Sequence, residues 1–199
     1  MRSFSRRSLA SLPVLLCFFA ACGRDAPRPD PASATALAAA GSAPATPETT
    51  RTGEVTVDRP PPSFKAKDQN GVELDLSALK GRPVVVYFYP RDETPGCTAE
   101  AKGLRDVWTQ IAEAGAVVIG ISRDSPESHR AFAKHHELPF HLVTDESMAI
   151  AQAFGVPRRI GLLARQSFVI GADGNVKRIY RDVDVSRHAR DVLADLQQR

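Results

Sequence analysis

From residue 54 to its C-terminus, the chain alternates between short apolar runs and polar segments rich in turn-forming residues. The apolar runs contain many β-branched and aromatic residues and are too short for core helices, so they predict buried strands. The turn sequence Ala172-Asp173-Gly174-Asn175 joins the last two strands in a predicted hairpin. The predicted strands cover residues 84–89, 116–121, 140–143, 166–170 and 176–181.

Between these strands, apolar residues recur at helical spacing, as Leu104, Trp108 and Ile111 do after the first strand. Ser125 is suited to cap a helix and Pro126 to begin one. The predicted helices cover residues 96–114, 125–138, 147–154 and 186–198.

Before the first buried strand, Val55–Val57 and Val72–Leu76 predict an N-terminal hairpin region, with a turn at Asn70-Gly71. Strands then alternate with helices and are followed by an antiparallel hairpin and a last helix. This order predicts one α/β domain over residues 54–199, with a mixed central sheet flanked by helices and the N-terminal hairpin as an extension.

The first 21 residues have the layout of a secretory signal, a basic stretch followed by an apolar one that is too short to span a membrane comfortably. Phe19-Ala20-Ala21-Cys22 resembles the lipobox of bacterial lipoproteins, although Phe19 stands where Leu is preferred. We therefore expect a lipoprotein-type signal peptide at 1–21 and lipidation of Cys22. An ordinary signal peptide is the alternative, and Arg6-Arg7 leaves both general and twin-arginine export open.

Residues 22–53 are dominated by Ala, Pro, Thr and Ser and cannot bury enough apolar surface to fold. We expect a disordered tether between the lipid and the domain. The protein is then extracytoplasmic and anchored to a membrane, on the periplasmic side in a bacterium.

The formal net charge is +3, but three of the 26 basic residues lie in the signal, and the others equal the 23 acidic residues in number. A domain without basic excess or clustered arginines lacks the electrostatic footprint of nucleic-acid binding, so we expect no nucleic-acid partner.

The chain has three cysteines, Cys17, Cys22 and Cys97. Cys17 lies in the predicted signal and Cys22 is the predicted lipid site, so the mature protein would keep one free thiol. A lone thiol is unusual in an exported protein, where unpaired cysteines are exposed to oxidation.

Cys97 is predicted to lie in the first turn of a helix that follows a buried strand. Pro90 ends that strand, and Pro95 and Gly96 redirect the chain. Unpaired N–H groups and the helix dipole favour an anion there, which stabilises the nucleophilic thiolate. Thr94 stands where a C-x-x-C motif has its first cysteine, and its hydroxyl is near enough in sequence to reach the sulfur.

The spacing Pro90-x-x-x-Thr94-x-x-Cys97 resembles the signature of peroxiredoxins. The longer stretch YFYPRDETPGCTAEAKGLRD is similar to the peroxiredoxin Q family, also called bacterioferritin comigratory proteins, and the similarity extends over residues 58–199. It implies a thioredoxin-like fold and thiol-dependent reduction of hydrogen peroxide and organic hydroperoxides, without a cofactor.

The resemblance also implies roles for individual residues. Cys97 matches the peroxidatic cysteine, and Thr94 and Pro90 match its partners in the signature. Arg165 matches the arginine that stabilises the thiolate and orients the peroxide, with Arg158 or Arg159 as alternatives. Glu100 fits a position that holds this arginine in some members.

The chain departs from the commoner family pattern, which has a second cysteine five residues after the first. Lys102 stands there, and residues 98–199 contain no cysteine. The predicted reductant is therefore an external thiol, either thioredoxin-like, glutaredoxin-like or small. No metal, haem or nucleotide motif is present, and we expect His135 and His136 on a solvated helical face.

Two alternatives remain at this point. A thiol-disulfide oxidoreductase of the same fold needs the cysteine that Thr94 replaces, and it usually has a Pro directly before the strand at Gln166. A membrane-tethered redox sensor needs the same reactive thiol, so only sustained turnover with a reductant distinguishes it from a peroxidase.

Overall fold

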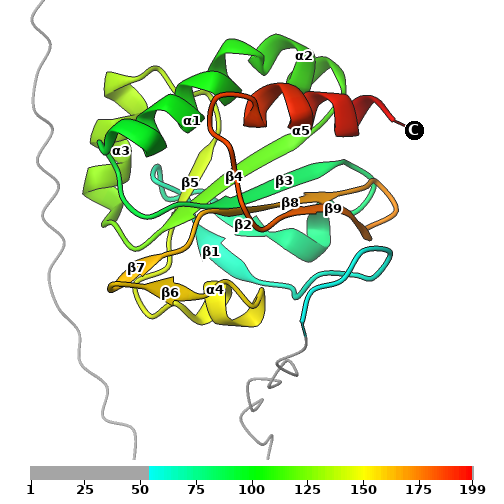
Figure 1. The fold of residues 1–199 in the computed structure, drawn as a ribbon, viewed down its shortest axis with the longest axis horizontal. Coiled ribbons are helices and arrows are strands. Elements are labelled where there is room, and N and C mark those ends of the chain that lie inside the picture. Colours follow the sequence, from blue (N-terminus) through cyan, green and yellow to red (C-terminus); the bar gives the residue numbers. More distant parts are fainter. Residues whose placement is uncertain (1–53, 199) are drawn as a thin grey trace, which may run out of the picture. The chain divides into compact units, whose positions relative to one another are not determined.

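In the computed structural model, residues 54–198 are described. The predicted signal at 1–21, the lipidation site Cys22 and the tether at 22–53 lie outside the described residues. The core of the domain is a five-stranded sheet with the order β5-β4-β3-β8-β9 (Figure 1). Its strands are β3 (Val84–Phe88), β4 (Val117–Ser122), β5 (His141–Thr144), β8 (Gln166–Ile170) and β9 (Val176–Tyr180).

The sheet is mixed, as predicted. Strand β3 pairs in parallel with β4 and antiparallel with β8. In the second pairing Phe88, the last residue of β3, lies opposite Gln166, the first residue of β8. The loop that leaves β3 and the loop that enters β8 therefore meet at the same end of these two strands.

Most of the helices cover one face of the sheet, and the shortest α-helix lies on the other face with the small hairpins (Figure 1). Those on the first face are α1 (Pro95–Asp106), α2 (Trp108–Glu113), α3 (Pro126–His135) and α5 (His188–Gln197). The opposite face carries α4 (Ala149–Ala153), the 3-10 helix η1 (Leu76–Leu79), and the hairpins β1 (Lys65–Lys67) with β2 (Glu73–Asp75) and β6 (Arg158–Arg159) with β7 (Leu162–Leu163). No helix among residues 54–198 is both long and apolar enough to cross a membrane.

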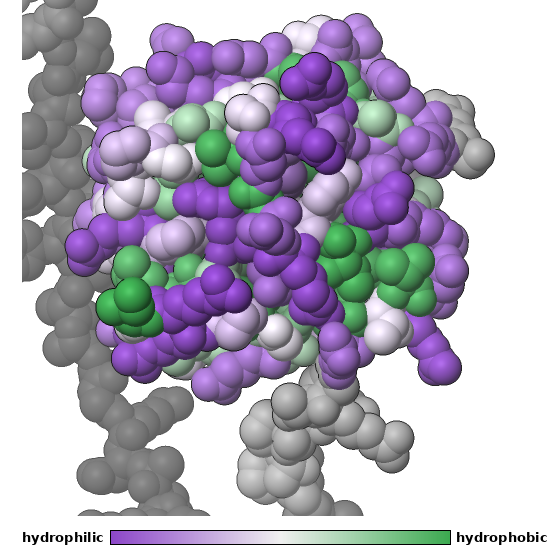
Figure 2. All heavy atoms as spheres, viewed as in Figure 1, coloured by the Kyte–Doolittle hydropathy of each residue, from purple (hydrophilic) through white to green (hydrophobic). Residues whose placement is uncertain are grey.

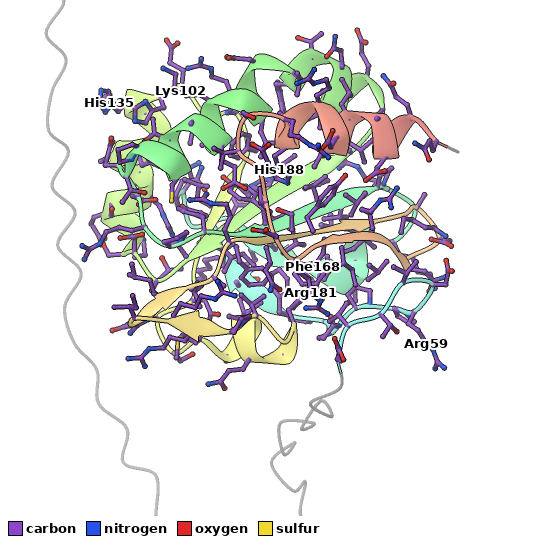
Figure 3. The ribbon with its side chains drawn as sticks, in the orientation of Figure 1. Arg59, Lys102, His135, Phe168, Arg181 and His188 are labelled. Atoms are coloured by element: carbon purple, nitrogen blue, oxygen red, sulfur yellow. The ribbon has the colours of Figure 1, made fainter. Side chains whose placement is uncertain are left out.

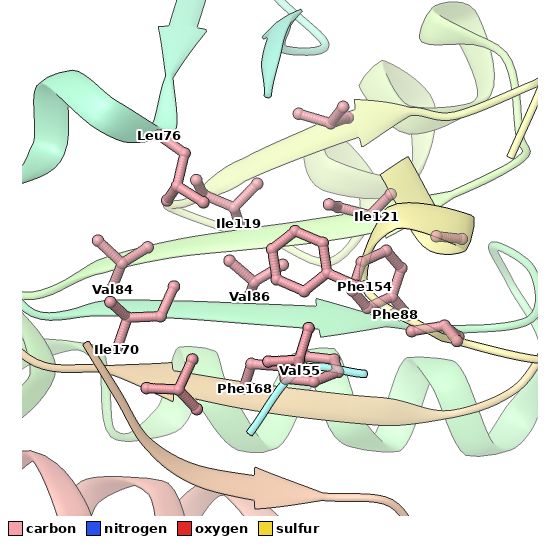
Figure 4. Close-up of a cluster of buried hydrophobic side chains, with 14 of the residues drawn as sticks. Val55, Leu76, Val84, Val86, Phe88, Ile119, Ile121, Phe154, Phe168 and Ile170 are labelled. Carbon is pink, nitrogen blue, oxygen red and sulfur yellow. The ribbon is translucent and has the colours of Figure 1, made fainter. Parts of the chain in front are cut away.

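Every side chain of β3 is buried, because the strand supplies both faces of the core. Val84, Val86 and Phe88 enter the cluster under α4 (Figure 4), and Val85 and Tyr87 enter the cluster under α1. Full burial of such side chains contributes about 1.5–3 kcal/mol each. Gly120 of β4 leaves room for Tyr87, since a Cβ there would lie 2.7 Å from the tyrosine ring.

The predicted N-terminal hairpin exists, but its first strand was placed wrongly. Val55 packs into the core without forming a strand, and Val57 is exposed. The partner of β2 is Lys65–Lys67, a strand too polar and too short to stand out in the sequence. Gly71, with a φ of 82°, makes the turn between them.

One further prediction needed correction. The helix predicted at 96–114 is interrupted at Val107, whose ψ of 12° is not helical: α1 ends at Asp106, and α2 begins at Trp108. Leu104 and Ile111, on either side of the break, are both buried. The β6–β7 hairpin was not predicted at all. Its turn residue Ile160 is fully exposed, within a surface that is otherwise mostly polar (Figure 2).

Candidate active site

The end of β3, the loop at 89–94 and the first turn of α1 carry the predicted site. Thr94 occupies the N-cap position of α1 in an extended conformation, and Pro95 is the first helical residue. Cys97 follows in the first turn with its side chain 1% exposed, and it is the free cysteine of the described residues. The thiol thus lies at the positive end of the helix, as the sequence predicted.

The Thr94 hydroxyl does not make the contact that its sequence position suggested. It donates a hydrogen bond to the carbonyl oxygen of Arg91 at 3.1 Å and makes no side-chain cap. Among the described residues, no hydrogen bond joins Thr94 to the Cys97 sulfur. Pro90 is half-buried and follows Tyr89 in the loop after β3. The hydroxyl is therefore bound to the Arg91 carbonyl in this structure and not to the thiol.

Arg165 reaches the sulfur from the loop that enters β8, the strand next to β3. Its Nη2 donates to Cys97 Sγ at 3.2 Å, across 68 residues of sequence. The register of β3 and β8 explains this contact, because Arg165 directly precedes Gln166, which lies opposite the end of β3. Arg158 and Arg159, the alternatives, are exposed in β6.

Gly96 lets the arginine approach. A Cβ on Gly96 would lie 3.3 Å from Arg165 Nη2, closer than most side-chain contacts. From the sequence, Gly96 was expected only to change the chain direction, and its second effect depends on a residue far along the chain. Glycine therefore serves the site by leaving space beside Cys97.

Glu100 holds the arginine in place. One of its carboxylate oxygens accepts a hydrogen bond from Arg165 Nη1, and the Glu100 side chain is fully buried. Burial alone would lower the pKa of the Arg165 guanidinium, but the nearby charges of Glu100 and Cys97 raise it overall. The site therefore contains a permanent positive charge beside the sulfur.

His188 is a further member of this buried group, although it has no ligand-like spacing in the sequence. Its Nδ1 lies 3.2 Å from the second oxygen of Glu100, and its side chain is 1% exposed. Tyr180 packs edge-on against the imidazole ring with centroids 5.5 Å apart. His188 is the first residue of α5 (Figure 3), whereas Glu100 lies in α1, so the contact between them comes from the tertiary fold alone.

The loop before Cys97 is fastened to the domain through buried Asp92. Its carboxylate accepts hydrogen bonds from Tyr89 at 2.8 Å and Ser128 at 2.7 Å, and it lies 2.9 Å from His129 Nδ1. The Asp92 amide donates to Asp124. Burial alone would raise the pKa of Asp92, but these hydrogen bonds, led by His129, lower it overall. The loop is thereby held against α3.

The Cys97 thiol has no second cysteine near it among residues 54–198. Lys102 is exposed on α1. The arrangement comprises one buried thiol, a guanidinium in contact with it, and a carboxylate behind the guanidinium. It suits attack on a small electrophile that develops negative charge as it is cleaved.

Comparison with known proteins identifies relatives of this chain. The family model "AhpC/TSA family" matches residues 57–179. Peroxiredoxin Q of Populus jackii, a chloroplastic protein, is 47% identical over 147 residues, which are 72% of this chain and 69% of that protein. This similarity includes the stretch that carries Cys97.

Solved structures agree with the sequence match. The peroxidoxin BcpB of Mycobacterium tuberculosis superimposes with a TM-score of 0.66 at 34% identity, covering 73% of this chain and 97% of that one. The bacterioferritin comigratory protein of Xanthomonas campestris gives a TM-score of 0.64 at 34% identity, covering 67% and 90%. The fold is therefore the predicted thioredoxin-like one, and the chain belongs to the AhpC/TSA family of peroxiredoxins and is a thiol-dependent peroxidase.

Proposed function

We propose that this peroxidase reduces hydrogen peroxide and organic hydroperoxides with Cys97 as its peroxidatic thiol, and that an external thiol regenerates it. The observation that carries the proposal is the contact of Arg165 with the Cys97 sulfur at 3.2 Å. The bacterioferritin comigratory protein of Xanthomonas campestris has alkyl peroxide reduction activity, which supports the same substrate class here.

In the first step, the Cys97 thiolate attacks the terminal oxygen of the peroxide. A sulfur–oxygen bond forms as the O–O bond breaks, and the departing oxygen takes a proton to leave as water or an alcohol. Arg165 and the backbone N–H of Cys97 stabilise the negative charge that develops on the departing oxygen. The Thr94 hydroxyl joins them by turning away from the Arg91 carbonyl, to which it donates in this structure. Pro90, which has no N–H, helps to exclude water. Cys97 is left as a sulfenic acid.

In the second step, a thiol from another molecule attacks the sulfenic acid, releases water and forms a mixed disulfide. A second thiol then restores Cys97 and leaves as the disulfide product. The absence of cysteine from residues 98–199, with Lys102 at the usual position of a second cysteine, supports this one-cysteine cycle. Thioredoxin-like proteins, glutaredoxin-like proteins and small thiols are the reductant classes.

The N-terminal sequence supports a location at a membrane. We propose that Cys22 carries lipid and holds the enzyme on the extracytoplasmic side, where hydroperoxides of membrane lipids are its preferred substrates. Replacing Cys22 with Ser should release the protein from the membrane fraction. Rate constants for fatty-acid hydroperoxides equal to or below that for hydrogen peroxide would contradict the preference.

The one-cysteine cycle is tested by oxidising the protein with stoichiometric hydrogen peroxide in the absence of thiols and mapping its products by mass spectrometry. The expected product is Cys97 sulfenic acid, which a trapping reagent captures. Thioredoxin, or glutaredoxin with glutathione, should then support repeated turnover. A resting disulfide between Cys97 and either Cys17 or Cys22 would contradict the proposal.

A further inference from the structure

Two histidines and one glutamate converge beside the loop that precedes Cys97. His135 Nδ1 lies 3.1 Å from one oxygen of Glu93, and His136 Nε2 lies 2.9 Å from the other. One donor atom from each of the three residues lies within 4.8 Å of the others. His135 ends α3 and projects from it (Figure 3), and His136 follows as its C-cap.

The three side chains have the donor chemistry of a transition-metal site. Imidazole nitrogens with a carboxylate oxygen suit zinc and its neighbours, which bind such atoms at about 2.0–2.2 Å. The two imidazole rings are stacked with centroids 4.2 Å apart, and each presents one nitrogen to the Glu93 carboxylate. The Glu93 and His135 side chains are 49% and 69% exposed, so water can complete the coordination.

Buried contacts fix the separation of these donors. Glu93 comes from the loop after β3, whereas the histidines come from α3, 42 and 43 residues later. The neighbouring residue Asp92 is buried and bound to Ser128 and His129 of the same helix. The loop and α3 therefore meet in a set arrangement, and little reorganisation is needed to bind an ion.

We propose that Glu93, His135 and His136 bind a divalent transition-metal cation of the zinc class, which ties the loop before Cys97 to the end of α3. The sequence alone predicted a solvated helical face here, because Glu93 lies far from the histidines along the chain. A bound cation joins the two segments at Glu93, directly before Thr94, and so restrains the loop at 91–94. The inference is independent of the peroxidase cycle.

The test is calorimetric titration of the full, untagged chain with zinc chloride, with all three cysteines replaced by Ser so that thiolates cannot bind the ion. One zinc per chain is expected. Glu93→Gln and His136→Gln should each weaken binding at least about tenfold, equivalent to about 1.4 kcal/mol. His141→Gln is the matched control, because His141 also lies 2.9 Å from a carboxylate, that of Asp68, but outside the cluster.

Equal affinity in the parent and the Glu93→Gln variant would overturn the site, as would no binding by the parent. Hydrogen exchange of the amides at 91–94 gives a second readout. Saturating zinc should slow their exchange in the parent and leave it unchanged in Glu93→Gln. If zinc binds but does not slow exchange, the proposed restraint of the loop is wrong.

Discussion

Removing the guanidinium of Arg165 should disable the thiol while the fold persists. Arg165→Ala deletes the hydrogen bond to Cys97 Sγ at 3.2 Å and leaves the buried carboxylate of Glu100 without its cation. Two effects are therefore expected, one on the reactivity of Cys97 and one on stability. They can be measured separately.

The size of the effect on the rate can be estimated from the hydrogen bond between Arg165 and Cys97. A hydrogen bond to a charged group contributes about 1.5–3 kcal/mol. At about 1.36 kcal/mol for each factor of ten in rate, loss of this hydrogen bond corresponds to a slowing of about 10- to 150-fold. Loss of a donor aimed at developing negative charge slows a reaction by about 10²–10³. We expect the rate constant for peroxide reduction to fall at least about 100-fold.

The assay is stopped-flow mixing of the reduced protein with hydrogen peroxide, together with the ultraviolet absorbance of the thiolate. Arg158→Ala is the matched control, since Arg158 is exposed in β6 and away from the sulfur. It should keep the rate of the parent. A rate for Arg165→Ala within a few-fold of the parent would refute the assignment of this arginine.

Stability needs its own control, because breaking a buried ion pair costs about 3–5 kcal/mol. Adding Glu100→Gln to Arg165→Ala removes the uncompensated buried charge. The double variant should regain much of the free energy of unfolding in urea but none of the rate. Recovery of the rate in the double variant would mean that the single substitution acted through misfolding.

Three further changes test the surroundings of the thiol. Gly96→Ala should slow peroxide reduction several-fold by displacing Arg165 from the sulfur, with little change in the thermal midpoint; an unchanged rate would show that the space is not needed. His188→Leu removes the imidazole that lies 3.2 Å from one buried Glu100 oxygen and should lower the free energy of unfolding, whereas an unchanged value in urea titrations would deny the contact any role. The pKa of Asp92 is lowered in the folded state, so its contribution to stability is present above about pH 4 and lost as the pH falls further. Asp92→Asn should therefore flatten the acid side of the stability profile, and an unchanged slope would contradict this.

The central strands could be predicted because a strand that is buried on both faces consists of consecutive apolar residues. The β3 sequence Val84–Phe88 is apolar throughout, β4 begins with an apolar run, and β8 has Phe168–Ile170 after two polar residues. Strand β1 could not be found in this way. Strand β1 has three residues, and its two lysines are exposed. It is a strand because it pairs with β2, and its own sequence has no apolar run that would reveal it.

The site residues also fall into two groups: those that local sequence predicts and those that only the tertiary fold brings together. Cys97 and its position at the start of α1 follow from a local sequence of strand, prolines and helix. Arg165 could be placed only through the family resemblance, and its contact depends on the register of β8 against β3. His188 and Asp92 were missed because their contacts join residues 88 and 37 positions apart, with no spacing to reveal them.

The most direct test of the account is the rate at which Cys97 becomes a sulfenic acid on mixing with stoichiometric hydrogen peroxide. Stopped-flow kinetics and mass spectrometry of the trapped product give both the rate and the residue. The account predicts one sulfenic acid, at Cys97, formed far faster than on free cysteine. Oxidation of Cys97 no faster than that of free cysteine would contradict it, because the contact with Arg165 would then not activate the thiol.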